Sequence, residues 1–145
     1  MAEAALNHAH GSRGFQAMSA GSHPTGMVNP LALDVLTANH IPTEALRSKS
    51  WDEFASQTVK SIDFVFTVCD NAAGEVCPVW PGHPITAHWG VPDPAAAEGT
   101  DDERRRAFQQ ALNTLRRRID LFCALPIEKL SRLSLQEHVT RIGGE

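Results

Sequence analysis

The sequence contains no tyrosine and only three cysteines, Cys69, Cys77 and Cys123, among its 145 residues. So few cysteines, odd in number, exclude the disulfide framework that stabilises many small secreted domains. No run of apolar residues is long enough for a transmembrane helix. The first residues also lack the basic start and apolar stretch of a signal peptide. We therefore expect a protein of the cytoplasm, where thiols stay reduced, with no membrane contact.

Positive charge is not in excess either. Thirteen Lys and Arg residues against 17 Asp and Glu residues give a net charge of −4, so the basic surface typical of nucleic-acid binding is missing. The two dense basic runs, Arg104–Arg106 and Arg116–Arg118, lie inside a helical pattern. We interpret them as a solvent-facing helix surface. The length and the 42% content of hydrophobic residues correspond to an ordinary globular domain with its own core.

Strand and helix patterns alternate along the sequence. The patterns predict helices over residues 1–9, 30–39, 51–59 and 101–122, and a last helix from Pro126 to Gly143. Strands are predicted over 15–20, 63–68 and 85–89, and the second of these is apolar enough to be fully buried. This alternation predicts an α/β fold with a small parallel sheet and helices on both faces.

Chemically active side chains follow each predicted strand. Ser19 ends the first strand, Cys69 ends the second, Cys77 comes after seven intervening residues, and Asp93 follows the third. Ligands of parallel sheets bind beyond the carboxyl ends of the strands. We therefore treat these four residues as one candidate site. Two thiols and a carboxylate in one site suggest redox or phosphate-type chemistry.

Six short motifs occur in a recognisable order. They are Ser19-Ala-Gly21, Val28-Asn-Pro30, Arg47-Ser-Lys49, Thr67-Val-Cys-Asp70, Cys77-Pro78 and His88-Trp-Gly-x-x-Asp-Pro94. Over about residues 1–122 the sequence resembles the arsenate reductases built on the low-molecular-weight protein tyrosine phosphatase fold. We expect residues 1–125 to form the reductase-like domain and residues 126–145 to form a C-terminal helical extension.

The resemblance implies a role for each candidate residue. Cys69 resembles the first thiol of a disulfide relay and Cys77 the second, although their spacing is one residue longer than expected. Asp93 resembles the general acid, and Ser19 the residue whose hydroxyl braces an anion-binding loop. The implied substrate is arsenate or a phosphate-like oxyanion, and the implied reductant is thioredoxin or glutathione with glutaredoxin. No organic cofactor is implied, because thiols carry the electrons.

One part of the family pattern is missing from the sequence. The family uses a Cys-x5-Arg loop after its first strand as nucleophile and anion cradle, and none of the three cysteines has an arginine six positions later. The run Ala2-Glu3-Ala4 resembles the helix that follows this loop. We therefore expect the first strand and the loop to be absent from this chain, which leaves it inactive alone.

Other interpretations remain open at this point. A phosphotyrosine phosphatase would use Asp93 but not the two thiols, and a phosphatase-like scaffold would have no turnover. Cys69, Cys77, His83 and His88 could instead bind zinc, although their spacing matches no compact finger. The candidate residues also have plain structural interpretations. Cys69 can end a buried strand, Asp93 and Ser19 can form turns, and Cys123 fits a helix core.

Overall fold

The computed structural model describes residues 1–55, 61–69, 80 and 82–145. Its main helices are α1 (Ala2–His10), α2 (Pro30–Ala38), α4 (Asp101–Cys123) and α5 (Arg132–Ile142). Two strands, β1 (Phe64–Thr67) and β2 (Ile85–His88), form a parallel sheet. Short 3₁₀ helices follow or precede these elements: η1 (Gly11–Arg13), η2 (Trp51–Phe54), η3 (Pro94–Ala96) and η4 (Ile127–Lys129). The predicted α/β class with a small parallel sheet is confirmed.

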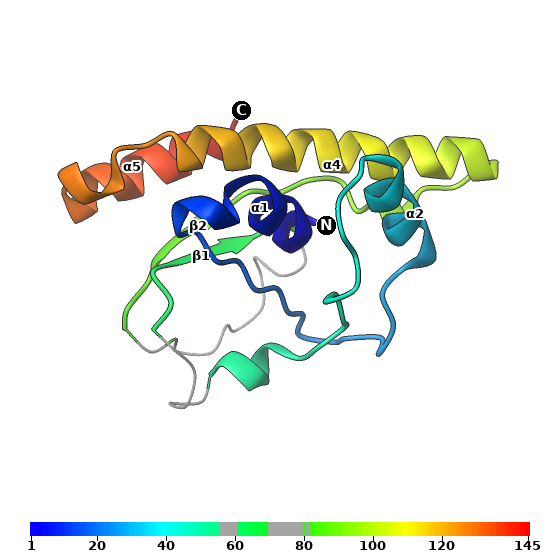
Figure 1. Ribbon diagram of the computed structural model, residues 1–145, viewed down its shortest axis with the longest axis horizontal. Helices are drawn as coiled ribbons and strands as arrows, with labels where there is room; N and C mark the ends of the chain where they lie inside the picture. Colours follow the sequence, from blue (N-terminus) through cyan, green and yellow to red (C-terminus); the bar gives the residue numbers. More distant parts are fainter. Residues whose placement is uncertain (56–60, 70–79, 81) are drawn as a thin grey trace.

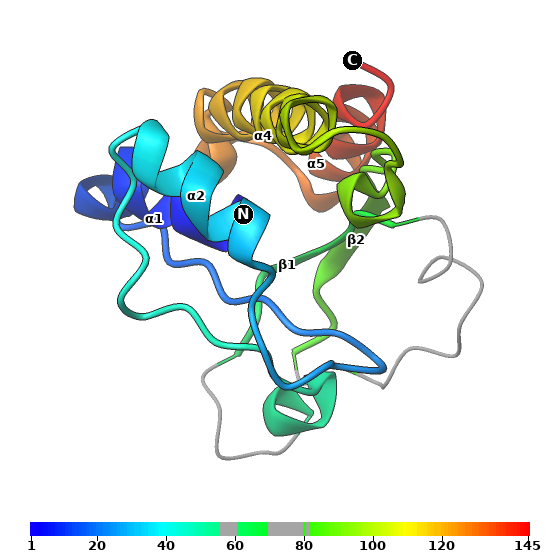
Figure 2. The same ribbon diagram turned by 90° about the vertical axis from the view of Figure 1, so that its right-hand side faces the viewer.

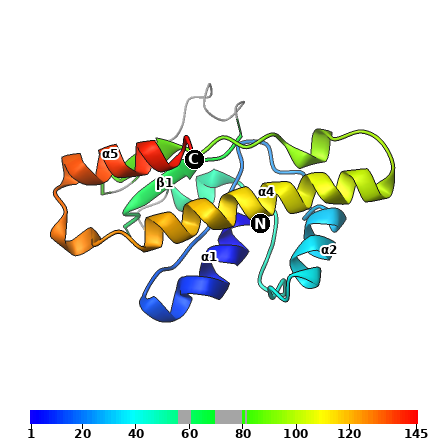
Figure 3. The same cartoon turned by 90° about the horizontal axis from the view of Figure 1, so that it is seen from above.

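Helix α4 crosses the whole molecule above the sheet (Figure 1). Seen from above, α5 runs along one side of α4, and α1 and α2 lie on its other side (Figure 3). The end-on view shows the two strands beneath this helical layer (Figure 2). Helix α4 packs against α1, α2 and α5, and α5 also packs against β2. In the described part of the chain, no helix has the length and apolarity needed to cross a membrane.

The helix starts follow from their capping residues. The Asn29 side chain accepts a hydrogen bond from the backbone of Leu31, and Pro30 occupies the first position of α2. Thr100 and Glu103 form a capping box at the start of α4. One expected start is wrong. The last helix begins at Arg132 instead of Pro126, because Ser131 is its cap and accepts a bond from Ser134.

The core centres on an aromatic cluster between β1 and α4. Phe64 and Phe66 lie two residues apart, so they share one face of the strand. Both meet the ring of Phe122 from α4, at centroid distances of 4.8 and 5.2 Å. Trp89 stacks on Phe66 at 3.9 Å and is only 2% exposed. This cluster fixes the sheet against the long helix.

Strand β1 is half-buried along its length, and the prediction of a fully buried strand is wrong. Among the described residues, β2 is its one strand partner, so its second edge gains no cover from a neighbouring strand. The predicted helix over 51–59 is seen as the 3₁₀ turn η2, and residues 56–60 lie outside the described part.

The predicted strand over 15–20 is also wrong, because the described residues give it no strand partner. The side chain of Asn7 instead bonds to the backbone of this segment, where a strand partner would bond. Its amide donates to the carbonyl of Ala17 at 3.0 Å, and its oxygen accepts from the N–H of Ala17 at 2.8 Å. Directly after this segment, Gly21 forms an isolated parallel bridge with Ser50.

Candidate functional site

The two parallel strands end side by side, and the loops that follow them are joined. Thr67 pairs with His88 at the last rung of the sheet. The N–H of Trp89 then donates to the carbonyl of Thr67 at 2.7 Å, and the N–H of Val91 donates to the carbonyl of Val68 at 2.9 Å. The backbone pairing therefore continues beyond both strands, up to the residue before Cys69.

Cys69 directly follows this pairing and is partly exposed. Asp93 lies two residues after Val91, on the neighbouring loop. The structure thus brings the segments that carry Cys69 and Asp93 to the same end of the sheet, as the sequence predicts. Cys77, the second predicted relay thiol, lies outside the described residues.

Asp93 is exposed and caps the short helix η3. Its Oδ1 accepts a hydrogen bond from the N–H of Ala95 at 3.0 Å, and Pro94 occupies the first helical position. Pro92 precedes it, so the backbone around the carboxylate is restricted on both sides. The predicted turn-forming role of Asp93 is confirmed, while its acid role stays a prediction.

The last rung of the sheet contains a polar pair that the sequence analysis did not assign. The Oγ1 of Thr67 lies 2.7 Å from the Nδ1 of His88. The two residues are direct partners in the parallel register, so a parallel alignment of the two predicted strands could have found this contact. It links the two strands immediately before Cys69 and Trp89.

Ser19 belongs to a polar cluster at the N-terminal end of α1. Its hydroxyl donates to the Oε2 of Glu3, and the ammonium of Lys49 lies 3.3 Å from the same oxygen. Lys49 also donates to the carbonyl of Arg47 at 3.3 Å. The sequence predicts Ser19 as a brace for an anion-binding loop, and in the structure its hydroxyl bonds to Glu3.

Arg118 is a residue whose place the sequence analysis predicted wrongly. It was assigned to a solvent-facing run, but its side chain is buried and its Nη1 donates to the carbonyls of Trp89 and Gly90. The helical period could have revealed this, because Arg118 follows Leu115 by three positions and precedes Phe122 by four, both on the buried face of α4. Arg118 therefore contacts the loop that leads to Asp93.

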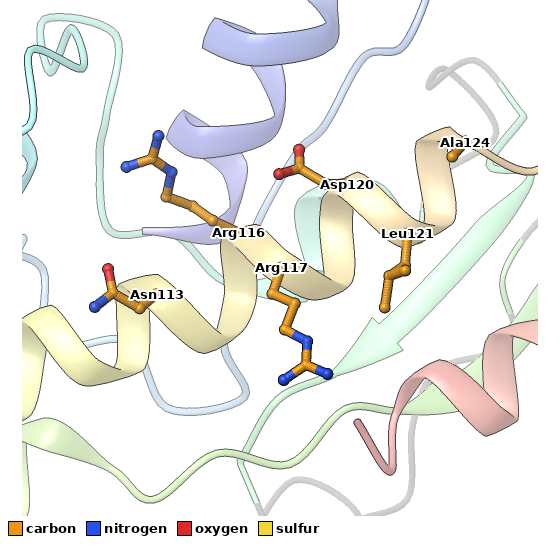
Figure 4. A pocket seen from close by; sticks show the side chains of 6 residues that line it. All are labelled: Asn113, Arg116, Arg117, Asp120, Leu121 and Ala124. Carbon is orange, nitrogen blue, oxygen red and sulfur yellow. The ribbon is translucent and has the colours of Figure 1, made fainter.

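A shallow cavity of about 520 Å³ lies on the outer surface of α4, away from the predicted site residues. Its lining side chains are Asn113, Arg116, Arg117, Asp120, Leu121 and Ala124. Figure 4 shows Arg116 and Asp120 pointing to one side of the helix and Arg117 and Leu121 to the other. The side chains diverge and leave the surface open, so this cavity offers no converging set of groups.

The proposed zinc ligands do not form a site in the part of the chain that the structure describes. There, no group of three or more His, Cys, Asp or Glu side chains is arranged to hold a metal ion. His88 instead contacts Thr67. His83 has a positive φ of 51° and its carbonyl accepts a bond from Arg132. Cys77 lies outside the described residues.

Comparison with known proteins extends these observations. Residues 1–134 match the family described as low molecular weight phosphotyrosine protein phosphatase. The chain belongs to this family. The match includes every predicted site residue and the whole of α4, with the first residues of α5 at its end. The chain therefore has the low-molecular-weight phosphatase fold. The parallel sheet whose strands are followed by Cys69 and Asp93 is part of this fold.

Individual relatives within the family are named arsenate reductases. The protein of Halalkalibacterium halodurans is 36% identical over 104 residues, which cover 72% of this chain and 71% of that protein. The protein of Shouchella clausii is 34% identical over 108 residues, which cover 74% of both chains. The protein of Bacillus subtilis is 32% identical over 108 residues, again covering 74% of both.

Proposed function

We propose that this protein takes part in the reduction of arsenate to arsenite, with Cys69 and Cys77 as the thiols of a disulfide relay and Asp93 as the general acid. The observation that carries the proposal is the backbone bond between Val68 and Val91, which joins the Cys69 loop to the loop of Asp93. The arsenate reductase names of the relatives support the same reaction.

The proposed reaction needs a nucleophile that these residues do not contain. No Cys-x5-Arg sequence occurs among the 145 residues, and the family resemblance assigns both the first thiolate and the anion cradle to that motif. We therefore assign the relay and the proton transfer to this chain, and we expect the 145 residues alone not to turn over arsenate.

The chemistry can be written as three balanced steps. A thiolate of the Cys-x5-Arg loop attacks arsenate, forms a sulfur–arsenic bond and displaces an oxygen, which Asp93 protonates so that it leaves as water. The Cys69 thiolate then attacks that sulfur. Two electrons pass to arsenic, As(V) becomes As(III), arsenite leaves and a disulfide forms. Cys77 next attacks Cys69, which releases the first thiol and leaves a Cys69–Cys77 disulfide.

An external thiol reductant completes the cycle by supplying two electrons to the Cys69–Cys77 disulfide. Thioredoxin or glutathione with glutaredoxin fits this role, and both operate in the reducing cytoplasm in which we place the protein. Ser19 is proposed as a support of the oxyanion loop. Residues 1–125 are proposed as the reductase unit, with 126–145 as an extension.

The test uses the protein made from its complete gene, assayed for arsenite with each reductant. We expect Cys69→Ser and Cys77→Ser to abolish multiple-turnover arsenate reduction. Without Cys69 the arsenic of the adduct is not reduced, and without Cys77 the first thiol is not released from its disulfide with Cys69. Hydrolysis of an aryl phosphate needs only the nucleophile, the cradle and Asp93, so it should continue in Cys69→Ser.

Two results would contradict the proposal. Arsenite formation that is independent of Cys69 would exclude the relay. Failure of the complete gene product to form arsenite with either reductant, together with aryl phosphate hydrolysis, would identify a phosphohydrolase of the family named in the match.

A further inference from the structure

Arg118 is buried in the C-terminal half of α4, on the face that packs into the core, where a charged side chain is costly. It is 7% exposed, whereas the side chain of its neighbour Arg117 is 66% exposed and contacts Glu145 at 3.3 Å. Burial lowers the pKa of the Arg118 guanidinium. Buried charges in proteins are normally paired with an opposite charge. Among the described residues, Arg118 forms no ion pair with a carboxylate, and its Nε has no hydrogen-bond partner.

The polar contacts of Arg118 are two main-chain carbonyls. Its Nη1 donates to the carbonyl of Trp89 at 2.8 Å and to that of Gly90 at 3.0 Å. Hydrogen bonds from a charged donor are stronger than neutral ones. The buried guanidinium thus bonds to two backbone oxygens, and these bonds restrict the position of the Trp89–Gly90 backbone.

The same short segment is held from two other directions. The backbone N–H of Trp89 donates to Thr67, the last residue of β1, and that of Val91 donates to Val68, which follows it. The indole N–H of Trp89 donates to the carbonyl of Val139 in α5 at 2.9 Å. The segment is therefore fixed between the sheet, α4 and α5. Asp93 follows two residues after Val91, and Pro92 stands between them.

We propose that Arg118 is a positioning residue, which fixes the Trp89–Val91 segment and thereby holds Asp93 beside the Cys69 loop. The inference rests on the proposed function, in which Asp93 delivers a proton to the departing oxygen. A general acid must lie within hydrogen-bond reach of its target, and small displacements are costly. Arg118 acts through the backbone and touches neither the substrate nor the reacting sulfurs.

Four variants test this role in the complete gene product: Arg118→Met, Arg118→Lys, Asp93→Asn and the double variant Arg118→Met/Asp93→Asn. We expect Arg118→Met to lower kcat by about tenfold or more, with KM changed less than about twofold, because oxyanion binding is assigned to other residues. Arg118→Lys should recover part of kcat, because an ammonium can still donate to both carbonyls. In the Asp93→Asn background, Arg118→Met should cost almost nothing further.

Amide hydrogen exchange gives a readout that does not depend on activity. The N–H groups of Val91 and Ala95 bond to Val68 and Asp93, so they report whether the loop is held. We expect Arg118→Met to speed their exchange by about tenfold or more. Arg118→Lys should lie closer to the parent, and Arg117→Met, the matched exposed control, should leave both amides unchanged.

Each outcome is decisive. Unchanged exchange at Val91 and Ala95 in Arg118→Met would overturn the proposal, and so would a kcat loss that adds fully to that of Asp93→Asn. If the parent protein forms no arsenite, the proposed function fails, and the exchange measurement alone decides whether Arg118 holds the loop.

Discussion

Lys49 is a buried charge that, unlike Arg118, forms an ion pair with a carboxylate. Glu3 receives the hydroxyl of Ser19 and the ammonium of Lys49, and Lys49 is 8% exposed. Removing one member of a buried ion pair leaves the other charged without compensation, which typically costs about 3–5 kcal/mol. The exposed pair of Arg47 and Glu53, also close at 2.6 Å, remains in water and carries no such penalty.

Glu3→Gln is therefore predicted to lower the free energy of unfolding by about 3 kcal/mol, because it leaves the Lys49 ammonium buried without its anion. Urea denaturation followed by circular dichroism measures this change. The double variant Glu3→Gln/Lys49→Met removes both charges and should recover part of the loss. As a control, Glu53→Gln removes the exposed ion pair and should have a much smaller effect. Equal losses in Glu3→Gln and Glu53→Gln would show that burial does not decide the strength of these pairs.

Cys123 differs from Cys69 in its surroundings. It is 1% exposed within α4, and burial raises the pKa of its thiol to about 11. The folded state therefore binds the thiol proton more tightly than the unfolded state does. The stabilisation is complete below the unfolded pKa and is lost as the pH rises towards the folded pKa.

Stability should accordingly fall between about pH 9 and pH 11, by up to about 2 kcal/mol from this one group. Urea denaturation at a series of pH values measures the trend. Other groups titrate in this range as well, so the comparison is with Cys123→Ala, whose curve should be flatter by that amount. Parallel curves for the parent and Cys123→Ala would refute the assignment.

At the scale of elements, local signals predicted the helices well and the strands less well. Asn29, Thr100 and Glu103 form caps through contacts within a few residues, so their effect can be read from the sequence. The segment 15–20 has a strand-like pattern but no strand partner, because Asn7 bonds to both backbone groups of Ala17. Strand formation depends on a distant partner, which the pattern of one segment does not reveal.

In the candidate site, too, some positions could be predicted from the sequence and others depend on distant partners. Cys69 and Asp93 could be placed at one end of the sheet, because parallel strands end at the same edge. Arg118 was missed because it occurs in a run of three arginines, and its partners are backbone carbonyls, which have no signature in the sequence. The loop that Arg118 contacts is fixed by tertiary packing, not by local preference.

Helix α5 docks against the end of β2 through a glycine. A Cβ atom at Gly143 would lie 2.5 Å from the carbonyl oxygen of His88 and 3.0 Å from Cδ1 of Trp89. Both neighbours are held in place by the sheet and by α4, so the helix must move. At Gly144, by contrast, the nearest atom would be the carbonyl oxygen of Arg141 at an ordinary 3.5 Å.

Gly143→Ala is predicted to lower the free energy of unfolding by about 1–3 kcal/mol through overpacking. Gly144→Ala is the matched control, with the same added methyl group one residue later, and should change stability by less than about 0.5 kcal/mol. Thermal denaturation of both variants decides the matter. An equal effect of the two substitutions would mean that the close approach of α5 to β2 is not required for stability.

For the molecule as a whole, α5 has a role beyond its own packing. The N–H of Ile85 donates to Asp63, just before β1, and that of Trp89 donates to Thr67 in β1. The carbonyl of Thr86 therefore faces the opposite edge of β2. Gln136 from α5 donates to this carbonyl at 2.8 Å, and Arg132 donates to the carbonyl of His83. Helix α5 therefore covers a sheet edge that would otherwise be open to pairing with another chain.

The same helix supplies Leu135, Val139 and Ile142 to the core. Each such side chain stabilises the fold by about 1.5–3 kcal/mol through burial. The sum approaches the total stability of an ordinary domain, about 5–15 kcal/mol. A chain that ends after Leu130 should thus lose most of its stability.

We therefore predict that this shortened chain loses cooperative thermal unfolding and self-associates through the uncovered edge of β2. Circular dichroism during heating and size-exclusion chromatography measure the two effects. Leu133→Ser in the full chain is the control, because Leu133 belongs to the same helix but is 71% exposed, so its replacement should leave both properties unchanged. A sharp transition near the parent midpoint in the shortened chain would show that the sheet and α4 form a sufficient core without α5. A monomeric shortened chain would show that the β2 edge needs no cover.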